Sequence, residues 1–111
     1  VAWLMGVGND AVLQAGSLLG TRTALNEFVS FLDLSRLKAD GKLTNPRDLM
    51  ILTYALCGFA NIVSIGIQLG GIGSIAPSQR ENLARLGWKA LLGASLACFL
   101  AATVAGILVP L

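Results

Sequence analysis

The hydrophobic and polar positions divide the chain into three apolar stretches and two charged segments. The apolar stretches cover residues 1–32, 49–77 and 90–111, and most of the charged residues lie in 33–48 and 80–89. A helix of about 20 apolar residues matches the roughly 30 Å hydrocarbon core of a bilayer. The pattern therefore predicts an all-α membrane protein with about three elements of membrane length.

The first stretch, which we extend to residues 1–34, is apolar but repeatedly interrupted by glycine and polar residues. Its two halves, 11–19 and 23–34, are each too short to cross a bilayer, and segments of that length are typical of re-entrant or buried helices. We predict a re-entrant helical hairpin over 1–34 with a glycine-rich tip at 16–23. Such a hairpin enters the membrane and returns to the same side, and its non-helical tip needs protein or a water-filled cavity around it.

A polar connector is predicted over residues 35–45, and the start of a helix follows it. Thr44-Asn45-Pro46 supplies a capping residue and a proline for the first turn. Asp48 adds an acidic side chain near the positive end of the helix dipole. We therefore expect a helix to begin at Pro46.

The second apolar stretch carries 28 uncharged residues from Leu49 to Ala76. A continuous helix of that length would measure about 42 Å, against a hydrocarbon core of about 30 Å. Several glycines and the polar pair Asn61 and Ser64 lie near its middle. We therefore predict a discontinuous transmembrane helix over 46–77, because polar groups at a break near the bilayer midplane are typical of a transporter binding site.

The rest of the chain consists of a basic segment and a last apolar stretch. Residues 78–89 are predicted to be a basic connector, as a short helix or a loop. Residues 90–111 contain no charge and are predicted to form a C-terminal transmembrane helix. Small residues at every fourth position from Gly93 to Ala105 would let this helix pack closely against another.

Glu27 is the charged residue that most needs an explanation, since it lies among apolar residues in the predicted hairpin. A carboxylate at bilayer depth is costly and is usually kept for a pathway, a relay or a ligand. Two other interpretations stay open for it: a carboxylate at the water interface, or an ion pair with Arg22. Asn61 and Ser64 share a helix face, and they either bind a polar substrate or form interhelical hydrogen bonds.

Composition supports a membrane protein and argues against other classes. The 111 residues are 55% hydrophobic and 13% charged, with a mean hydropathy of +0.74, whereas an average soluble domain carries about 25% charged residues. A net charge of +2 is too small and too scattered for nucleic-acid binding. The chain has no histidine, and neither a paired acid–base set nor a metal cluster is visible. We therefore expect no enzyme, no cofactor and no metal site in this segment.

Four motifs follow one another along the chain. They are A-G-S-L-L-G-T at 15–21, L-N-E-F-V at 25–29, Y-A-L-C-G-F-A-N at 54–61, and S-I-G-I-Q at 64–68 with two glycines after it. In their order and spacing they resemble the C-terminal part of the concentrative nucleoside transporters, and the match runs over the whole chain. Chance similarity between apolar helices would not reproduce Asn-Glu-Phe together with Gly-Phe-Ala-Asn.

The resemblance implies the second half of an inverted repeat that carries the transport core. It implies that Glu27, Asn61 and Ser64 bind the ribose of a nucleoside, and that Phe59 lies by the same site. It further implies secondary active transport coupled to a gradient of sodium or protons, with the coupling ion bound mainly outside this segment. The full-length protein would be a multi-pass protein of the plasma membrane, the inner membrane in bacteria, and would assemble as a homotrimer.

Other functions stay open beside nucleoside transport. The main alternative is a non-transporting membrane interaction module, in which Glu27 and Asn61 are interhelical polar contacts. A third is a passive channel or a receptor, which would show flux without ion coupling or binding without flux. The chain opens in mid-pattern without an initiator methionine, so we expect it to be part of a longer polypeptide.

Overall fold

A computed structural model describes residues 1–109. They form α-helices joined by short turns, and no strand occurs among them. The helices are α1 (Val12–Ala24), α2 (Glu27–Ala39), α3 (Pro46–Leu56), α4 (Ile62–Ile75) and α5 (Arg80–Leu108). Single turns of 3₁₀-helix lie at Trp3–Met5, Asn9–Ala11 and Pro77–Gln79. The predicted all-α fold is confirmed.

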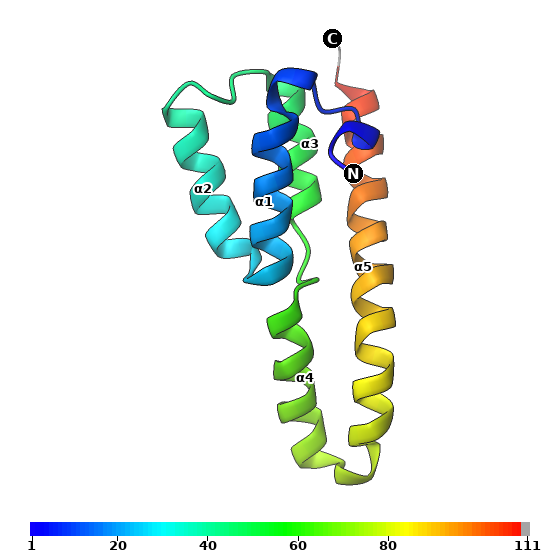
Figure 1. The fold of residues 1–111 in the computed structure, drawn as a ribbon. Coiled ribbons are helices and arrows are strands. Elements are labelled where there is room, and N and C mark those ends of the chain that lie inside the picture. Colours follow the sequence, from blue (N-terminus) through cyan, green and yellow to red (C-terminus); the bar gives the residue numbers. More distant parts are fainter. Residues whose placement is uncertain (110–111) are drawn as a thin grey trace.

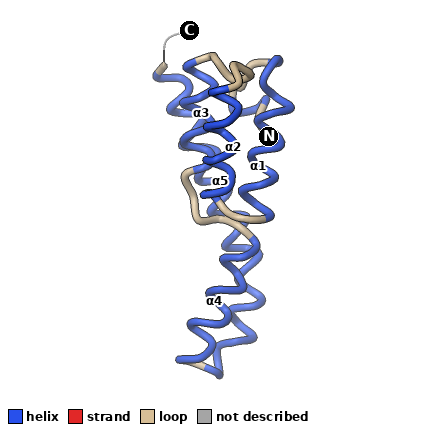
Figure 2. The backbone as a smooth tube through the Cα atoms, turned by 90° about the vertical axis from the view of Figure 1, so that its left-hand side faces the viewer, coloured by secondary structure: helices blue, strands red, loops and turns tan. Residues whose placement is uncertain are grey.

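The molecule is elongated, measuring 51 × 25 × 17 Å, and α5 runs along its length (Figure 1). α3 and α4 follow one another end to end beside α5, and α5 contacts both of them. α1 and α2 form an antiparallel hairpin that packs against α3 in one half of the molecule. Figure 1 and Figure 2 both place the turn of this hairpin at the level of the gap between α3 and α4.

The core lies between α1, α3 and α5. α3 contributes Ile51, Leu52, Ala55 and Leu56, all of which are fully buried. Their spacing places them on one face of the helix. α5 comes close to this face because Gly106 has no side chain: a Cβ there would lie 2.6 Å from Cγ1 of Ile51.

α3 begins at Pro46, as predicted from the sequence. The side-chain oxygen of Asn45 accepts a hydrogen bond from the backbone nitrogen of Arg47 at 2.9 Å, which caps the helix. Asp48 lies in the first turn and is buried, and its carboxylate accepts a hydrogen bond from the backbone nitrogen of Gly8 at 3.0 Å. Asp48 thus interacts favourably with the positive end of the helix dipole, and it also holds the start of the chain against α3.

The hairpin turns at Asn26, so the prediction of a glycine-rich tip at 16–23 is wrong. α1 continues through Gly16 and Gly20, where an added Cβ would find nothing within 4 Å. A glycine in an exposed helix position costs only about 1 kcal/mol, so it does not end the helix. Asn26 instead starts α2, because its side-chain oxygen accepts a hydrogen bond from the backbone nitrogen of Val29 at 2.9 Å.

Both charged segments contain more helix than predicted. α2 passes the predicted end of the hairpin and runs to Ala39, so only the last part of the predicted connector 35–45 is non-helical. A glycine with positive φ, Gly41 at 71°, follows the end of this helix. Residues 80–89 are helical, which was one of the two predicted options, but they form the first turns of α5 rather than a separate connector over 78–89. Leucine, alanine, arginine and glutamate dominate these residues, and all of them favour helix whether or not they face lipid.

Within residues 1–109, one helix is long and apolar enough to cross a membrane. It is α5 with the turn before it, Pro77–Leu108, which spans 32 residues. α4 is also apolar but has only 14 residues. The predicted C-terminal helix over 90–111 lies within α5 as far as Leu108, and residues 110 and 111 lie outside the described part of the chain.

Replacing Gly106 with alanine tests the close contact between α3 and α5. The new Cβ would press on Ile51, and the carbonyl oxygen of Gly106 accepts a hydrogen bond from Nε of Arg47 at 2.8 Å. Overpacking typically costs about 1–3 kcal/mol, so we expect Gly106→Ala to lower the unfolding temperature of the full-length protein in detergent. Gly93→Ala is the control, because nothing lies within 4 Å of its added Cβ and alanine favours helix. Equal unfolding temperatures for the two variants would contradict this packing.

Candidate functional site

Glu27 and Asn61 meet where two helices begin. Glu27 is the first residue of α2, and Asn61 is the residue that caps α4. Nδ2 of Asn61 donates a hydrogen bond to Oε2 of Glu27 at 3.2 Å. Glu27 follows the hairpin turn, and Asn61 is the last residue of the gap between α3 and α4. The structure therefore brings together the two polar positions that were expected to bind a polar ligand.

The amide oxygen of Asn61 holds the first turn of α4. It accepts hydrogen bonds from the backbone nitrogen and from the hydroxyl of Ser64, both at 2.8 Å. A backbone N–H can only donate, so the amide oxygen must face α4 and the amide nitrogen is left to face Glu27. Asn61 is 1% exposed. Its side chain is therefore buried and fixed at both ends.

The carboxylate of Glu27 keeps acceptor capacity for a ligand. The side chain is half-buried, and its Oε2 accepts a hydrogen bond from Asn61. A carboxylate offers about four lone-pair positions. The N-termini of α2 and α4 both lie at this group, and their positive dipole ends favour a negative charge there. The site can thus accept further hydrogen bonds from a polar molecule.

Glu27 is not paired with Arg22, which was one of the interpretations left open by the sequence. The guanidinium of Arg22 is fully buried, and none of its nitrogens has a hydrogen-bond partner in the described part of the chain. It lies over the ring of Phe99 in α5, 5.7 Å from the ring centroid. No motif assigns Arg22 a role beyond that possible pair, and the contact with Phe99 joins residues that are far apart in the sequence.

The gap between α3 and α4, residues 57–61, confirms the predicted break in the second apolar stretch. α3 stops because the backbone nitrogen of Gly58 donates to the carbonyl of Leu56 at 2.8 Å instead of continuing the helical pattern. Gly58 also has no room for a side chain. A Cβ would lie 2.9 Å from Nη2 of Arg22 and would collide with Sγ of Cys98. Packing against α1 and α5 therefore fixes where the break lies.

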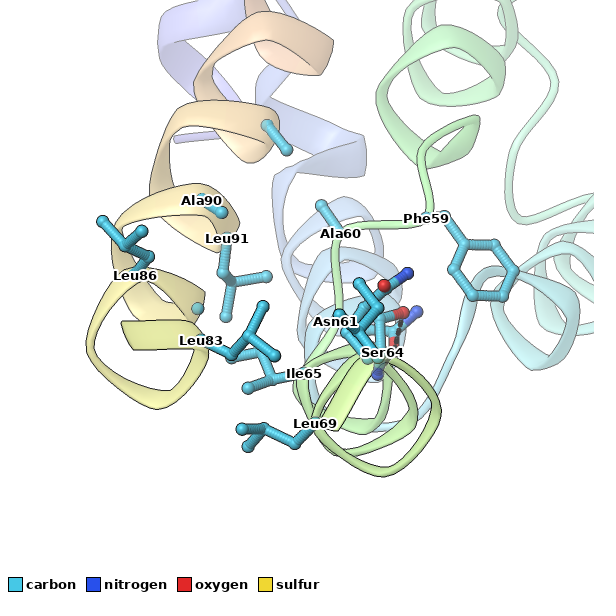
Figure 3. A pocket seen from close by; sticks show the side chains of 14 residues that line it. Phe59, Ala60, Asn61, Ser64, Ile65, Leu69, Leu83, Leu86, Ala90 and Leu91 are labelled. Carbon is cyan, nitrogen blue, oxygen red and sulfur yellow. Dashed lines mark hydrogen bonds between the residues drawn. The ribbon is translucent and has the colours of Figure 1, made fainter. Parts of the chain in front are cut away.

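The polar cluster adjoins an apolar groove, and Phe59 is among the residues that line it (Figure 3). The side chain of Phe59 is 68% exposed. The groove lies between α4 and α5 and has a volume of about 410 Å³, which is typical of a small-molecule site. Asn61 and Ser64 line the groove where it approaches the break. Its walls are mostly apolar and include Ile65, Leu69, Ile72, Leu83, Leu86 and Leu91.

The sequence can be compared with known families and proteins. A family profile described as "Na+ dependent nucleoside transporter C-terminus" matches residues 1–106. The chain belongs to this family. An uncharacterized transporter of Haemophilus influenzae is 42% identical over 114 residues, which cover 100% of this chain and 27% of that protein. The motif resemblance to nucleoside transporters is thereby confirmed.

Other members of the nucleoside transporter family agree in sequence and in structure. The nucleoside permease NupC of Helicobacter pylori is 35% identical over 113 residues, covering 100% of this chain and 27% of the permease. The structure of CNTnw in an inward-facing substrate-bound state is 36% identical and superposes with a TM-score of 0.89, over 96% of this chain and 26% of CNTnw. The chain therefore spans about a quarter of the length of each of these relatives.

Exchanging donor and acceptor tests the hydrogen bond between Asn61 and Glu27. Asn61→Asp keeps an oxygen to cap α4 but removes the donor and places a second carboxylate beside the first. We expect it to lower the free energy of unfolding by about 1–3 kcal/mol. Adding Glu27→Gln should recover most of that loss, because the new amide can donate to the new carboxylate.

The measurement is denaturant unfolding of the ligand-free, full-length protein in detergent, for the parent, both single variants and the double variant. Such a double-mutant cycle isolates the interaction between the two side chains. Ser74→Ala, which changes an exposed hydroxyl on α4, serves as a control for polar substitutions in this region. Additive effects of the two single changes would show that the side chains do not interact.

Proposed function

We propose that the full-length protein is a secondary active transporter of nucleosides, and that this segment supplies the ribose-binding half of its site. The observation that carries the proposal is the cluster of Glu27, Asn61 and Ser64 at the starts of two helices. Membership of a family described as sodium-dependent supports a cation gradient, with sodium rather than protons, as the driving force. We place the binding of that cation mainly outside this segment.

Ribose fits the cluster because its two neighbouring hydroxyl groups match the available donors and acceptors. The carboxylate of Glu27 can accept a hydrogen bond from each hydroxyl, and bonds to a charged acceptor are about twice as strong as neutral ones. Nδ2 of Asn61 uses one hydrogen for Glu27, so its second hydrogen can donate to a ribose oxygen. The hydroxyl of Ser64 lies on the same turn of α4. A sugar without these hydroxyls would leave the polar groups unpaired, which is how such a site rejects it.

Phe59 is proposed to contact the nucleoside beside the ribose. Its exposed ring projects from the break, close to the polar cluster (Figure 3). An aromatic face next to polar groups suits a ligand that is part sugar and part flat base. We assign Phe59 a packing role, because its side chain offers no hydrogen bond.

The helix lengths support a specific arrangement in the membrane. α3 has 11 residues and α4 has 14, so each is shorter than the roughly 30 Å hydrocarbon core at 1.5 Å per residue. We propose that they cross together as one discontinuous helix and that α5 crosses alone. The α1–α2 hairpin is proposed to be re-entrant, because its two outer ends lie at the same end of the molecule and its turn reaches only part of the way along α5 (Figure 1).

We extend the family resemblance to the whole protein. It is proposed to be a multi-pass protein of the plasma membrane, the inner membrane in bacteria, and to assemble as a homotrimer. The alternative of a non-transporting membrane module would use the same bond between Glu27 and Asn61 only to join helices. Spare acceptor capacity on a half-buried carboxylate favours a ligand over such a purely structural bond.

Nucleoside uptake by the full-length protein in vesicles tests the proposed function. We expect saturable uptake of labelled uridine or adenosine that needs an inward sodium gradient. Glu27→Gln should reduce uptake at least ~100-fold at low substrate concentration, because two charge-assisted hydrogen bonds contribute about 1.5–3 kcal/mol each. Glu81→Gln, which changes an exposed acid on α5, is the matched control and should transport normally.

A second arm uses 2′,3′-dideoxyuridine, which lacks both hydroxyl groups. It should be transported poorly by the parent protein, and Glu27→Gln should reduce its uptake far less than that of uridine. Normal uridine uptake by Glu27→Gln would remove the ribose role. Uptake without any dependence on a cation gradient would indicate a channel, and no nucleoside uptake or binding in any variant would favour the interaction module.

A further inference from the structure

Arg22 is a fully buried cation that the proposed transport site does not use. It lies in the last turn of α1, and its side chain has no exposed surface. Nε, Nη1 and Nη2 are all buried without a hydrogen-bond partner among residues 1–109. Burying a charge without a partner is unfavourable. The groups around the guanidinium must therefore offset that cost. Their identity indicates the role of the charge.

The guanidinium lies between the break and α5. The ring of Phe99 is one neighbour, with its centroid 5.7 Å from Cζ; the electron-rich face of an aromatic ring attracts a cation. Gly58 is another, because a Cβ added there would lie 2.9 Å from Nη2. Gly58 follows the end of α3 by two residues. The guanidinium thus lies next to the segment that follows the end of α3.

A positive charge stabilises α3 most when it lies near the C-terminal end of that helix. The last carbonyl groups of a helix have no helical donor and carry the negative end of its dipole. In a soluble protein, water would bind them, whereas here they lie inside a membrane segment. Arg22 places a delocalised positive charge near this point, and because its nitrogens donate no hydrogen bond within residues 1–109, the interaction with these carbonyl groups is electrostatic. Gly58 permits the approach, since any side chain there would displace either Arg22 or Cys98.

We propose that Arg22 is a positioning residue of the transport site. Its charge stabilises the negative end of α3 and fixes the break, and the break fixes Asn61 three residues after Gly58. The same side chain also belongs to α1, which leads through the hairpin turn into Glu27. Arg22 therefore sets the position of Asn61 relative to Glu27 without touching the substrate. This inference rests on the proposed binding of nucleoside by those two residues.

Arg22→Lys and Arg22→Gln in the full-length protein separate the charge from the shape of the side chain. Lysine keeps the positive charge, and glutamine keeps polar donors without it. We expect Arg22→Gln to raise KM for uridine about tenfold, which lies within the range for removing a charge at a helix end. Vmax per transporter in the membrane should stay within about twofold. Arg22→Lys should keep KM within about threefold of the parent.

Hydrogen–deuterium exchange gives a readout that does not depend on nucleoside. In the purified, ligand-free protein, the amides of residues 57–61 should exchange about tenfold faster in Arg22→Gln than in the parent, because a loosened break opens more often. Arg36→Gln is the matched control. Its arginine is on α2, is 75% exposed in an ion pair with Asp33, and should change neither KM nor exchange.

Each outcome decides the role of Arg22. Unchanged KM and unchanged exchange in Arg22→Gln would overturn the proposal, and so would equal KM values for the lysine and glutamine variants. If neither variant reaches the membrane while Arg36→Gln does, Arg22 is needed for folding and the positioning role is rejected. If the parent protein takes up no nucleoside, the proposed function fails, and the exchange of residues 57–61 still decides whether Arg22 fixes the break.

Discussion

The side-chain amide of Asn61 is the interaction on which the arrangement of the site depends. Its oxygen accepts the hydrogen bonds that start α4, and its nitrogen donates to the carboxylate of Glu27 at the start of α2. One side chain therefore sets where the broken helix resumes and where the acid of the hairpin points. A change in either contact would move the other, because the side chain is buried and bonded at both ends.

A break in a membrane helix leaves backbone groups without hydrogen-bond partners, and it can also form a binding site. Backbone groups at a break have no water to bond with, so they persist only where side chains or neighbouring segments stabilise them. Here two asparagines, Asn26 and Asn61, cap the helices that start inside the molecule. The two helix N-termini then face the same carboxylate and stabilise its charge. The helix N-termini that stabilise a half-buried acid thus also leave part of its carboxylate free to accept further hydrogen bonds.

Part of this structure could be predicted from residue patterns, and the rest depended on packing. The break was predictable because an uncharged stretch longer than a bilayer, with Asn61 in its middle, cannot form one plain helix. The position of the hairpin turn was not, because Gly16 and Gly20 suggested a tip, whereas the cap at Asn26 decides it. The burial of Arg22 was also not predictable, because its neighbours come from α5 and from the break, far away in the sequence. Hydropathy likewise underestimated helix in the charged segments, since helix propensity does not depend on whether a residue faces lipid.

A structure of the full-length protein with a nucleoside bound tests the central claim most directly. We predict that each ribose hydroxyl either donates to the carboxylate of Glu27 at about 2.5–3.0 Å or accepts from Nδ2 of Asn61 at about 2.7–3.2 Å. Asn61 should still cap α4 in that complex. A nucleoside whose ribose contacts neither side chain, with Glu27 bonded only to Asn61, would contradict the claim.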